Sequence, residues 1–246
     1  MNNTVKKAFD IVRLVEKNQG KLTLSDIVRI LEMNKTTVFR SLKTLEDLEI
    51  LEKIDKFYYL GISLFELGNK VYLKQIIVEK IHPILKMLSE EVNETVNLAK
   101  LHNGMVLYLD KIESTRSLQI QSSIGDTLPL YCTSLGKSIL SILPEEETEK
   151  IFDSFKFKKF TQNTIINKKS LIKQIEKVKD RGFSVDEEEF EEGLVCVSVP
   201  LFLKEHSFYG GLSLSGPSIR FTQKNINIIA SRLKEYKKLI LNKINS

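Results

Sequence analysis

Residues 34–45 read "NKTTVFRSLKTL", and as a helix this stretch has two chemically different sides. Val38, Leu42 and Leu45 fall on one side at helical spacing, which predicts a buried face. The other side carries short polar and cationic side chains, and Asn34 is a good residue to cap the start of the helix. Such a face is typical of a helix that enters the major groove of DNA, although charged helix faces are more often simply solvated.

The segments around this stretch favour the DNA-binding interpretation. Residues 4–17 and 24–31 place apolar residues at helical spacing, and Thr23 with Asp26 resembles a capping box. Two β-prone runs, 50–54 and 57–60, flank Asp55-Lys56 and predict a hairpin. Three helices and a hairpin in this order are the outline of a winged helix-turn-helix domain. Small three-helix units that bind proteins are the alternative.

The third helix and the hairpin wing supply the candidate DNA contacts. Lysine and arginine neutralise phosphates, and arginine also bonds the edge of guanine in bidentate fashion. Threonine hydroxyls at a helix start reach phosphates. We therefore predict that the DNA-binding residues are Lys35, Thr36, Thr37, Phe39, Arg40, Lys43, Lys53 and Lys56.

The length of the chain allows two ordinary domains or one large one, and its composition is normal for a globular protein. The chain has 246 residues, of which 42% are hydrophobic and 28% charged. No apolar run reaches the roughly 18 residues that a membrane span needs, and the start of the chain lacks the apolar stretch of a secretory signal. We therefore expect a cytoplasmic protein. The net charge of +5 permits a polyanionic partner without requiring one.

After the winged domain the pattern changes twice. We expect residues 1–61 to form the winged domain, 62–76 a linker helix that also pairs subunits, and 77–246 an α+β domain with an antiparallel sheet. Asn103-Gly104 is the strongest hairpin signal in the chain. Further helices are predicted at 133–143, 144–155, 168–182 and 222–242, and strands at 183–189, 193–203 and 209–216.

Three stretches of the larger domain carry polar residues that a purely hydrophobic core does not need. In "IGDTLPLYCTSLGKSIL", residues 124–140, a loop opens a helix whose free N–H groups suit an anion. The Gly-Lys-Ser at 136–138 is not a phosphate loop, because Tyr131 occupies the position of the required first glycine. In "SVDEEEFEEGLVCVSVP", residues 184–200, Asp186 follows an alternating strand and can point inward, whereas we expect residues 187–189 to be solvated.

The third stretch, "GLSLSG" at residues 211–216, places Ser213 and Ser215 on one face of a strand. Two hydroxyls on one face of a central strand either bond their neighbours or form the floor of a polar pocket.

With these motifs the sequence resembles the IclR family of bacterial transcriptional regulators. The matching N-terminal stretches are "VKKAFDIV", "LTLSDI", "NKTTVFRSLKTLEDL" and "YYLGISLFELG". The family's Gly-Asp-x-x-Pro-Leu loop, Gly-Lys-x-x-Leu helix, Asp-x-Glu-Glu segment with Gly-x-x-Cys, and Ser-x-Ser-Gly follow in order. The family usually has a glycine where the helix meets the wing, and in this chain Glu49 stands near that place.

The resemblance implies a GAF-like second domain that binds a small organic acid or related metabolite. Carried over by position, the effector-binding residues are Leu128, Ser134, Leu135, Asp186, Leu194, Cys196, Ser213 and Ser215. Position 134 is often glycine or alanine in relatives, so the serine here is expected to alter which effector fits.

The function we predict is a ligand-responsive regulator of a catabolic operon, with repression favoured over activation. Because one winged domain contacts only a few base pairs, we expect a homodimer or homotetramer on a palindromic, double-stranded operator. We predict no cofactor and no metal, although Asp186 and Cys196 would be able to meet a metal across a strand pair.

The alternative is an enzyme that acts on a small metabolite and is fused to a DNA-binding domain. His82, His102 and His206 are scattered along the chain, and no Gly-x-Ser-x-Gly or Cys-x-x-Cys motif is present. A cysteine nucleophile needs a base nearby, and the sequence places no histidine beside Cys132 or Cys196.

Overall fold

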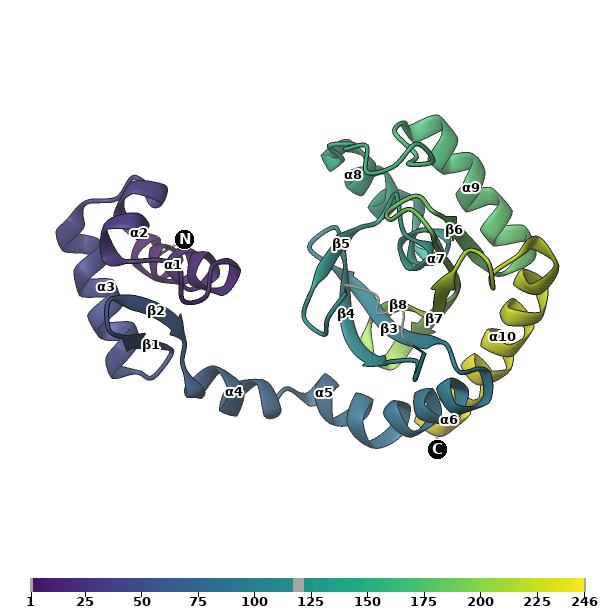
Figure 1. Ribbon diagram of the computed structural model, residues 1–246, viewed down its shortest axis with the longest axis horizontal. Helices are drawn as coiled ribbons and strands as arrows, with labels where there is room; N and C mark the ends of the chain where they lie inside the picture. Colours follow the sequence, from purple (N-terminus) through teal and green to yellow (C-terminus); the bar gives the residue numbers. More distant parts are fainter. Residues whose placement is uncertain (1, 117–121, 246) are drawn as a thin grey trace. The chain divides into compact units, whose positions relative to one another are not determined.

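The computed structural model describes residues 2–116 and 122–245 (Figure 1). The chain divides into two compact units, residues 1–75 and 76–246. Each unit has its own hydrophobic core, so each is described by itself.

The first unit is a winged helix-turn-helix, as the sequence predicts. Its elements are α1 (Asn3–Lys17), α2 (Leu24–Leu31), α3 (Lys35–Asp47), β1 (Leu51–Ile54) and β2 (Phe57–Leu60). The two strands pair antiparallel across a turn at Asp55, which adopts a φ of 56°. The predicted caps are confirmed, because Thr23 and Asp26 form a reciprocal capping box and Asn34 Oδ1 accepts from the N–H of Thr36 at 2.9 Å.

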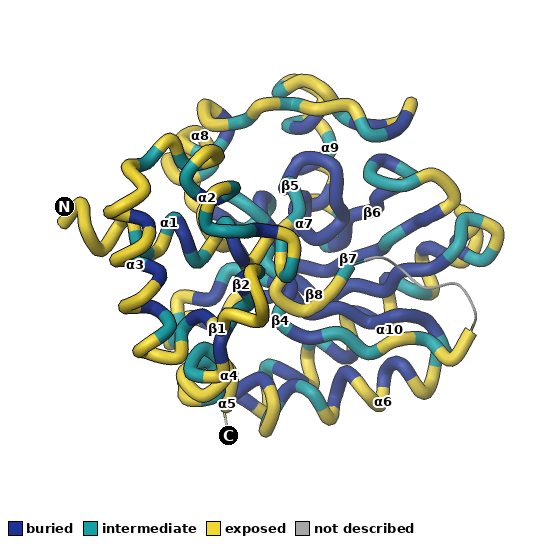
Figure 2. The backbone as a smooth tube through the Cα atoms, turned by 60° about the vertical axis from the view of Figure 1, so that its left-hand side comes forward, coloured by how far each residue is buried: buried dark blue, intermediate teal, exposed yellow. Residues whose placement is uncertain are grey.

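The helical spacing within α3 explains how this unit holds together. Val38, Leu42 and Leu45 are buried in one cluster with residues of the other two helices and of the wing. The opposite side of α3 faces solvent and is yellow in Figure 2. The apolar stripe thus fixes which side of the helix is left free for a partner.

The junction of α3 with the wing is unusually tight. Glu49 occupies the left-handed region at φ 53°. Gly61 lies directly against it, since a Cβ on Gly61 would be only 2.1 Å from the carbonyl oxygen of Glu49. The glycine that the wing requires is therefore the one that follows β2.

The prediction of one linker helix over 62–76 is wrong, because the structure has two short helices there. The chain forms α4 (Ile62–Asn69) and a separate short helix, α5 (Tyr72–Ile76). Gly68 and Asn69, both poor helix formers, stand at the end of α4 and favour the interruption.

A π-helical turn, η1 (Ile77–Ile81), then leads into α6 (His82–Val92). Pro83 lies in the first turn of α6 and has no N–H to give to the carbonyl four residues earlier. A widened turn at this point accommodates the proline without ending the helical path.

The second unit is built on one antiparallel sheet of the order β5-β4-β3-β8-β7-β6. The strands are β3 (Thr95–His102), β4 (Met105–Ile112), β5 (Thr127–Pro129), β6 (Ser184–Glu187), β7 (Leu194–Leu203) and β8 (Phe208–Pro217). The helices besides α6 are α7 (Ser134–Ile142), α8 (Glu145–Ser154), α9 (Lys168–Arg181) and α10 (Gln223–Asn245), with a short 3-10 turn, η2 (Lys204–His206). This confirms the predicted α+β class with an antiparallel sheet.

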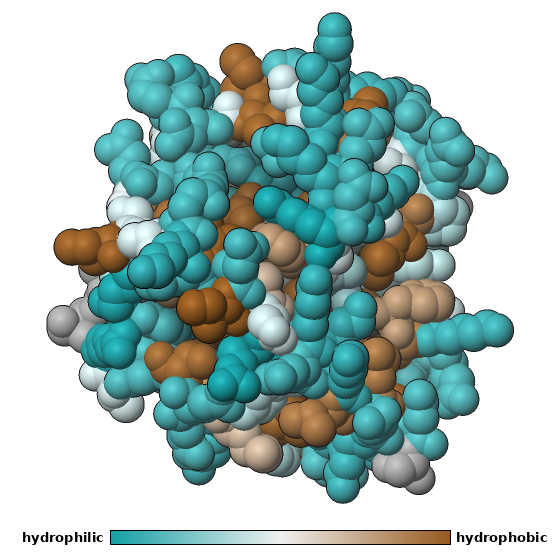
Figure 3. All heavy atoms as spheres, turned by 90° about the vertical axis from the view of Figure 1, so that its right-hand side faces the viewer, coloured by the Kyte–Doolittle hydropathy of each residue, from teal (hydrophilic) through white to brown (hydrophobic). Residues whose placement is uncertain are grey.

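Helices cover both faces of this sheet. Figure 2 shows α7 above β7 and β8, with α6 and α10 below them. On the face of the molecule drawn in Figure 3, apolar side chains form small, separate groups among hydrophilic ones. The sheet is therefore an enclosed layer, and polar side chains that point from it toward α7 are buried.

We expect Gly61→Ala to destabilise the winged unit, because its methyl group has no room beside the Glu49 carbonyl. The loss should be about 1–3 kcal/mol, the usual cost of overpacking. Gly68→Ala is the matched control. It has open space and a helical position, and should stabilise by roughly 0.5–1 kcal/mol. Urea denaturation of both variants measures this, and equal stabilities would contradict the steric account.

Candidate DNA-binding surface and effector site

The structure exposes every predicted DNA-binding residue. Arg40 and Lys43 project from the free side of α3, and Lys53 and Lys56 project from the wing. Lys43 pairs only loosely with Asp47 at 3.6 Å, and both side chains are exposed, so solvent weakens this pair. The remaining four residues are also exposed: Lys35, Thr36, Thr37 and Phe39.

Aromatic rings support the two lysines of the wing. Lys53 Nζ lies 5.7 Å from the ring centroid of Tyr58, and Lys56 Nζ lies 5.4 Å from that of Phe57. Contacts at this distance are weakly attractive for a cation. They keep both ammonium groups beside the hairpin while leaving them in solvent.

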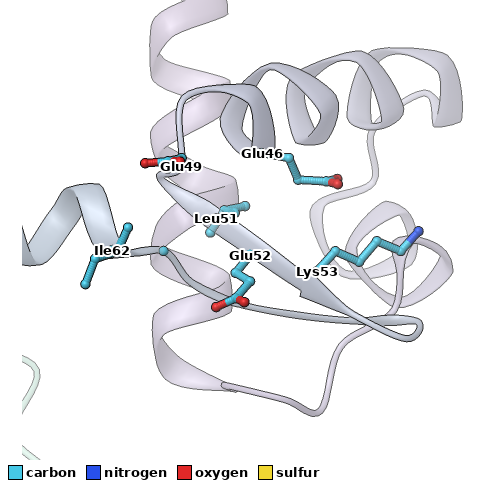
Figure 4. A pocket seen from close by; sticks show the side chains of 7 residues that line it. Glu46, Glu49, Leu51, Glu52, Lys53 and Ile62 are labelled. Carbon is cyan, nitrogen blue, oxygen red and sulfur yellow. The ribbon is translucent and has the colours of Figure 1, made fainter.

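A depression near the base of the wing is acidic, in contrast to the cationic surface of α3 and the wing. It is lined by Glu46, Glu49 and Glu52 together with Leu51, Lys53, Gly61 and Ile62. Figure 4 shows the Lys53 side chain extending away from Glu49 and Ile62. Three carboxylates repel phosphates, so this depression lies outside any surface that follows the DNA backbone.

The second candidate site is the sheet face beneath α7. Directly paired residues of neighbouring strands point to the same face. The register pairs Ser215 with Cys196, and Cys196 with Asp186. Ser213 pairs with Asn97 on its other side. These five side chains from four strands therefore form one polar patch, which we call the sheet patch.

A β-bulge in β4 adds two more side chains to this face. The register shifts so that Asn97 pairs with Lys111 whereas Ala99 pairs with Tyr108. Residues three apart normally point to opposite faces of a strand, and the extra residue Leu109 brings both to the same face. The bulge thus turns Tyr108 and Lys111 toward the sheet patch.

Close backbone packing positions α7 over the sheet. A Cβ on Gly136 would be 2.1 Å from the carbonyl oxygen of Leu130, and one on Gly211 would be 3.0 Å from Leu135 Cδ2. Beneath the helix, Ser138 Oγ lies 2.7 Å from Ser198 Oγ and 3.1 Å from Ser184 Oγ. These three buried serines satisfy one another, so they belong to the packing of α7.

A buried ion pair stands next to the sheet patch. Lys137 Nζ donates to a carboxylate oxygen of Glu189 and, at 2.6 Å, to the carbonyl of Val185. The expectation that Glu189 is solvated is wrong, because its side chain is buried. The N–H of Glu189 donates to Asp186 Oδ1 at 2.7 Å, and this turn draws Glu189 inward.

Burial controls the protonation of the acidic and thiol groups at this site. Desolvation raises the pKa of Asp186 to about 7, although Lys137 opposes the shift. Desolvation likewise raises the pKa of Glu189. The pKa values of the Cys132 and Cys196 thiols are also raised by burial. Both cysteines are therefore thiols at neutral pH, whereas a cysteine nucleophile needs a thiolate.

The structure places the predicted effector residues around the sheet patch. Asp186, Leu194, Cys196, Ser213 and Ser215 share the sheet face, and the register adds Leu128 through its pairing with Val106. Ser134 and Leu135 begin α7. Sequence reasoning missed Asn97, Tyr108, Lys111, Lys137 and Glu189. A polar residue inside the otherwise apolar stretch 96–99 was the available signal for Asn97.

No group of three His, Cys, Asp or Glu side chains within the described part of the chain is placed to hold a metal ion. Asp186 and Cys196 are cross-strand neighbours, as the sequence suggested, and a third ligand does not join them in residues 2–116 and 122–245. Over the same residues, none of the helices is long and apolar enough to cross a membrane.

Family models cover both units of the chain. That of the IclR helix-turn-helix domain matches residues 4–55, and that of the bacterial transcriptional regulator IclR C-terminal domain matches residues 70–240. The chain belongs to the IclR family. The HTH-type transcriptional regulator KdgR of Escherichia coli K12 is 30% identical over 236 residues, which cover 95% of this chain and 87% of KdgR.

Solved IclR structures share this fold. The crystal structure of IclR from Thermotoga maritima aligns over 100% of both chains with a TM-score of 0.74 and 33% identity. An IclR homologue from Microbacterium hydrocarbonoxydans, complexed with 4-hydroxybenzoate, aligns over 98% of this chain and 100% of its own with a TM-score of 0.83 and 19% identity. The matched C-terminal family model and KdgR both describe transcriptional regulators.

The raised pKa of Asp186 predicts how stability depends on pH. Because the native state binds this proton more tightly than the unfolded state, the group reduces stability as pH rises from about 4 to 7. Asp186→Asn removes that loss. Its stability relative to the wild type should rise by roughly 2–4 kcal/mol over this range and then level off.

Urea denaturation of the wild type and Asp186→Asn at pH 4.5 to 8 measures the difference. Glu187→Gln, an exposed acid on the same strand, is the control and should follow the wild type. A difference that stays constant with pH would contradict the buried-acid account.

Proposed function

We propose that this protein is a ligand-responsive repressor that binds a palindromic operator through its winged units and a small organic acid through its effector unit. The observation that supports this most is the separation of two surfaces. One unit presents an exposed cationic helix and wing, and the other encloses a polar patch beneath α7. The protein would act in the cytoplasm, where bacterial operators are.

In the proposed DNA complex α3 lies in the major groove. Arg40 is the candidate for a bidentate contact with guanine, and Phe39 offers an apolar contact for a thymine methyl. Lys35, Thr36, Thr37 and Lys43 contact phosphates, as do Lys53 and Lys56 of the wing. The bound protein represses by occupying DNA that transcription needs.

A homodimer is part of the proposal, with a homotetramer as its extension. Large apolar side chains of α1 and α4 are exposed, among them Phe9 at 61%, Ile62 at 65% and Phe65 at 67%. A second copy that covers them would supply the second half-site contact that a palindrome requires.

The proposed effector site is the sheet patch together with the start of α7. Leu128, Leu135 and Leu194 would give apolar walls, and Asp186, Ser213 and Ser215 would give polar contacts, with Ser134 and Cys196 completing the site. The homologue complexed with 4-hydroxybenzoate supports a carboxylic acid as the type of effector. To change DNA affinity, the effector must bind one arrangement of the dimer better than another.

Two variants separate base contacts from phosphate contacts on the operator. Arg40→Ala should cost about 1–3 kcal/mol on the operator and relax specificity. Lys56→Ala should weaken binding to all sequences alike and reduce the salt slope by about one unit. Fluorescence anisotropy at several salt concentrations measures both. Lys169→Ala, an exposed lysine of α9, is the control, and variants that bind like it would remove α3 and the wing from the DNA contact.

A third variant tests the effector site. Ser215→Ala should bind operator like the wild type but no longer release it when the effector is added, because the effector loses a hydroxyl partner. The effector is first identified by a thermal-shift screen of small carboxylates. Ser218→Ala, just beyond the same strand, should respond normally. A normal response of Ser215→Ala would show that the effector site lies elsewhere. Consumption of the effector would instead favour the enzyme alternative.

A further inference from the structure

Asn97 of β3 and Ser213 of β8 are the most deeply buried polar residues of the sheet patch. Each is 1% exposed. Asn97 Nδ2 donates to Ser213 Oγ and to Ser215 Oγ, at 3.2 Å each. Asn97 Oδ1 is buried and has no hydrogen-bond partner in residues 2–116 and 122–245.

These hydrogen bonds determine which donors and acceptors of the sheet patch are left for a ligand. An amide NH₂ has two protons, and Asn97 uses both on the two serines. Each serine accepts from Asn97, so its own hydroxyl proton stays available to donate. Ser215 hydrogen-bonds the sulfur of Cys196 across the sheet, and because sulfur is only a weak acceptor, a ligand oxygen would compete well for this proton. The patch therefore presents two hydroxyl donors and one unsatisfied amide acceptor.

A cation stands on the same face. Lys111 is the cross-strand neighbour of Asn97, and only 7% of its side chain is exposed. Its Nζ donates to Glu113 Oε1 at 2.9 Å and to the carbonyl of Ser122 at 2.6 Å. Lys111 is therefore already ion-paired. The two hydroxyl donors are the groups of the patch that suit an anionic oxygen, whereas the unsatisfied Oδ1 needs a ligand that donates.

We propose that Asn97 is a positioning and specificity residue. Its amide NH₂ and its Oδ1 together select a hydroxy acid as effector. By donating to Ser213 and Ser215, it turns their hydroxyl protons toward a carboxylate or oxo oxygen of the ligand. Its Oδ1 accepts from a hydroxyl group of the same ligand. A plain carboxylate leaves this acceptor unsatisfied and is discriminated against, as at other sites built to bond a substrate hydroxyl. The inference rests on the proposed effector site and names its ligand class.

Two matched pairs of acids test it: lactate with propionate, and gluconate with hexanoate. Titration calorimetry at constant pH and salt gives the affinity of the full-length wild type for each. In at least one pair the hydroxy acid should bind ten times more tightly or better. In Asn97→Leu, which has neither donors nor acceptor, this preference should fall to within threefold.

Ser198→Ala is the matched control, since Ser198 lies on the same sheet face but is satisfied by serines of the α7 contact. It should keep the wild-type preference. Circular dichroism checks folding. If Asn97→Leu fails to fold, Asn97→Asp, which keeps the volume but loses both N–H donors, takes its place and should bind gluconate and lactate at least tenfold less tightly than the wild type.

Equal affinities within both pairs, no binding of any of the four acids, a preference that survives in Asn97→Leu, or wild-type affinity for gluconate and lactate in Asn97→Asp would each overturn the inference. Operator binding, measured separately, keeps this outcome distinct from failure of the proposed function. If plain acids release the operator and this release requires Ser215, the proposed function is supported and the role of Asn97 is contradicted. If the wild type binds no DNA, the proposed function is contradicted, while the measured acid preference still tests the role of Asn97.

Discussion

The strand register of the effector unit is the constraint on which the proposed site depends. Pairing Asn97 with Ser213, Ser215 with Cys196, and Cys196 with Asp186 brings residues far apart in the sequence onto one face. A slip of one residue would send each side chain to the face covered by α6 and α10. The bulge at Leu109 is the single departure from regular pairing between β3 and β4, and it adds Tyr108 and Lys111 to the same face.

Close packing by α7 gives this polar face its low dielectric. Gly136 lets the helix approach Leu130, and Gly211 leaves room for Leu135. The resulting burial raises the pKa of Asp186 and sets Lys137 against Glu189 in an ion pair. Buried polar groups are costly for stability unless they are satisfied, so retaining an unsatisfied Asn97 Oδ1 here fits a ligand site better than a packing role.

How much the sequence predicts depends on the range of the interactions involved. The α3 face, the caps at Thr23 and Asn34 and the turn at Asn103-Gly104 follow from local periodicity and turn chemistry, and the structure confirms them. The break in the linker helix and the burial of Glu189 could not be predicted from these local patterns. The latter depends on Lys137, 52 residues away in the chain. Asn97 was missed because its serine partners lie 116 and 118 residues away, and no local pattern reports such pairing.

The central claim is that the exposed winged unit and the buried sheet patch are coupled through one equilibrium. Coupling between two binding sites is reciprocal, so an effector that weakens operator binding by some factor must itself bind more weakly to the operator complex by the same factor. Measuring the affinity of one acid for the free protein and for the operator-bound protein tests this directly. The account predicts two affinities that differ by the factor seen in DNA binding; identical affinities would contradict it.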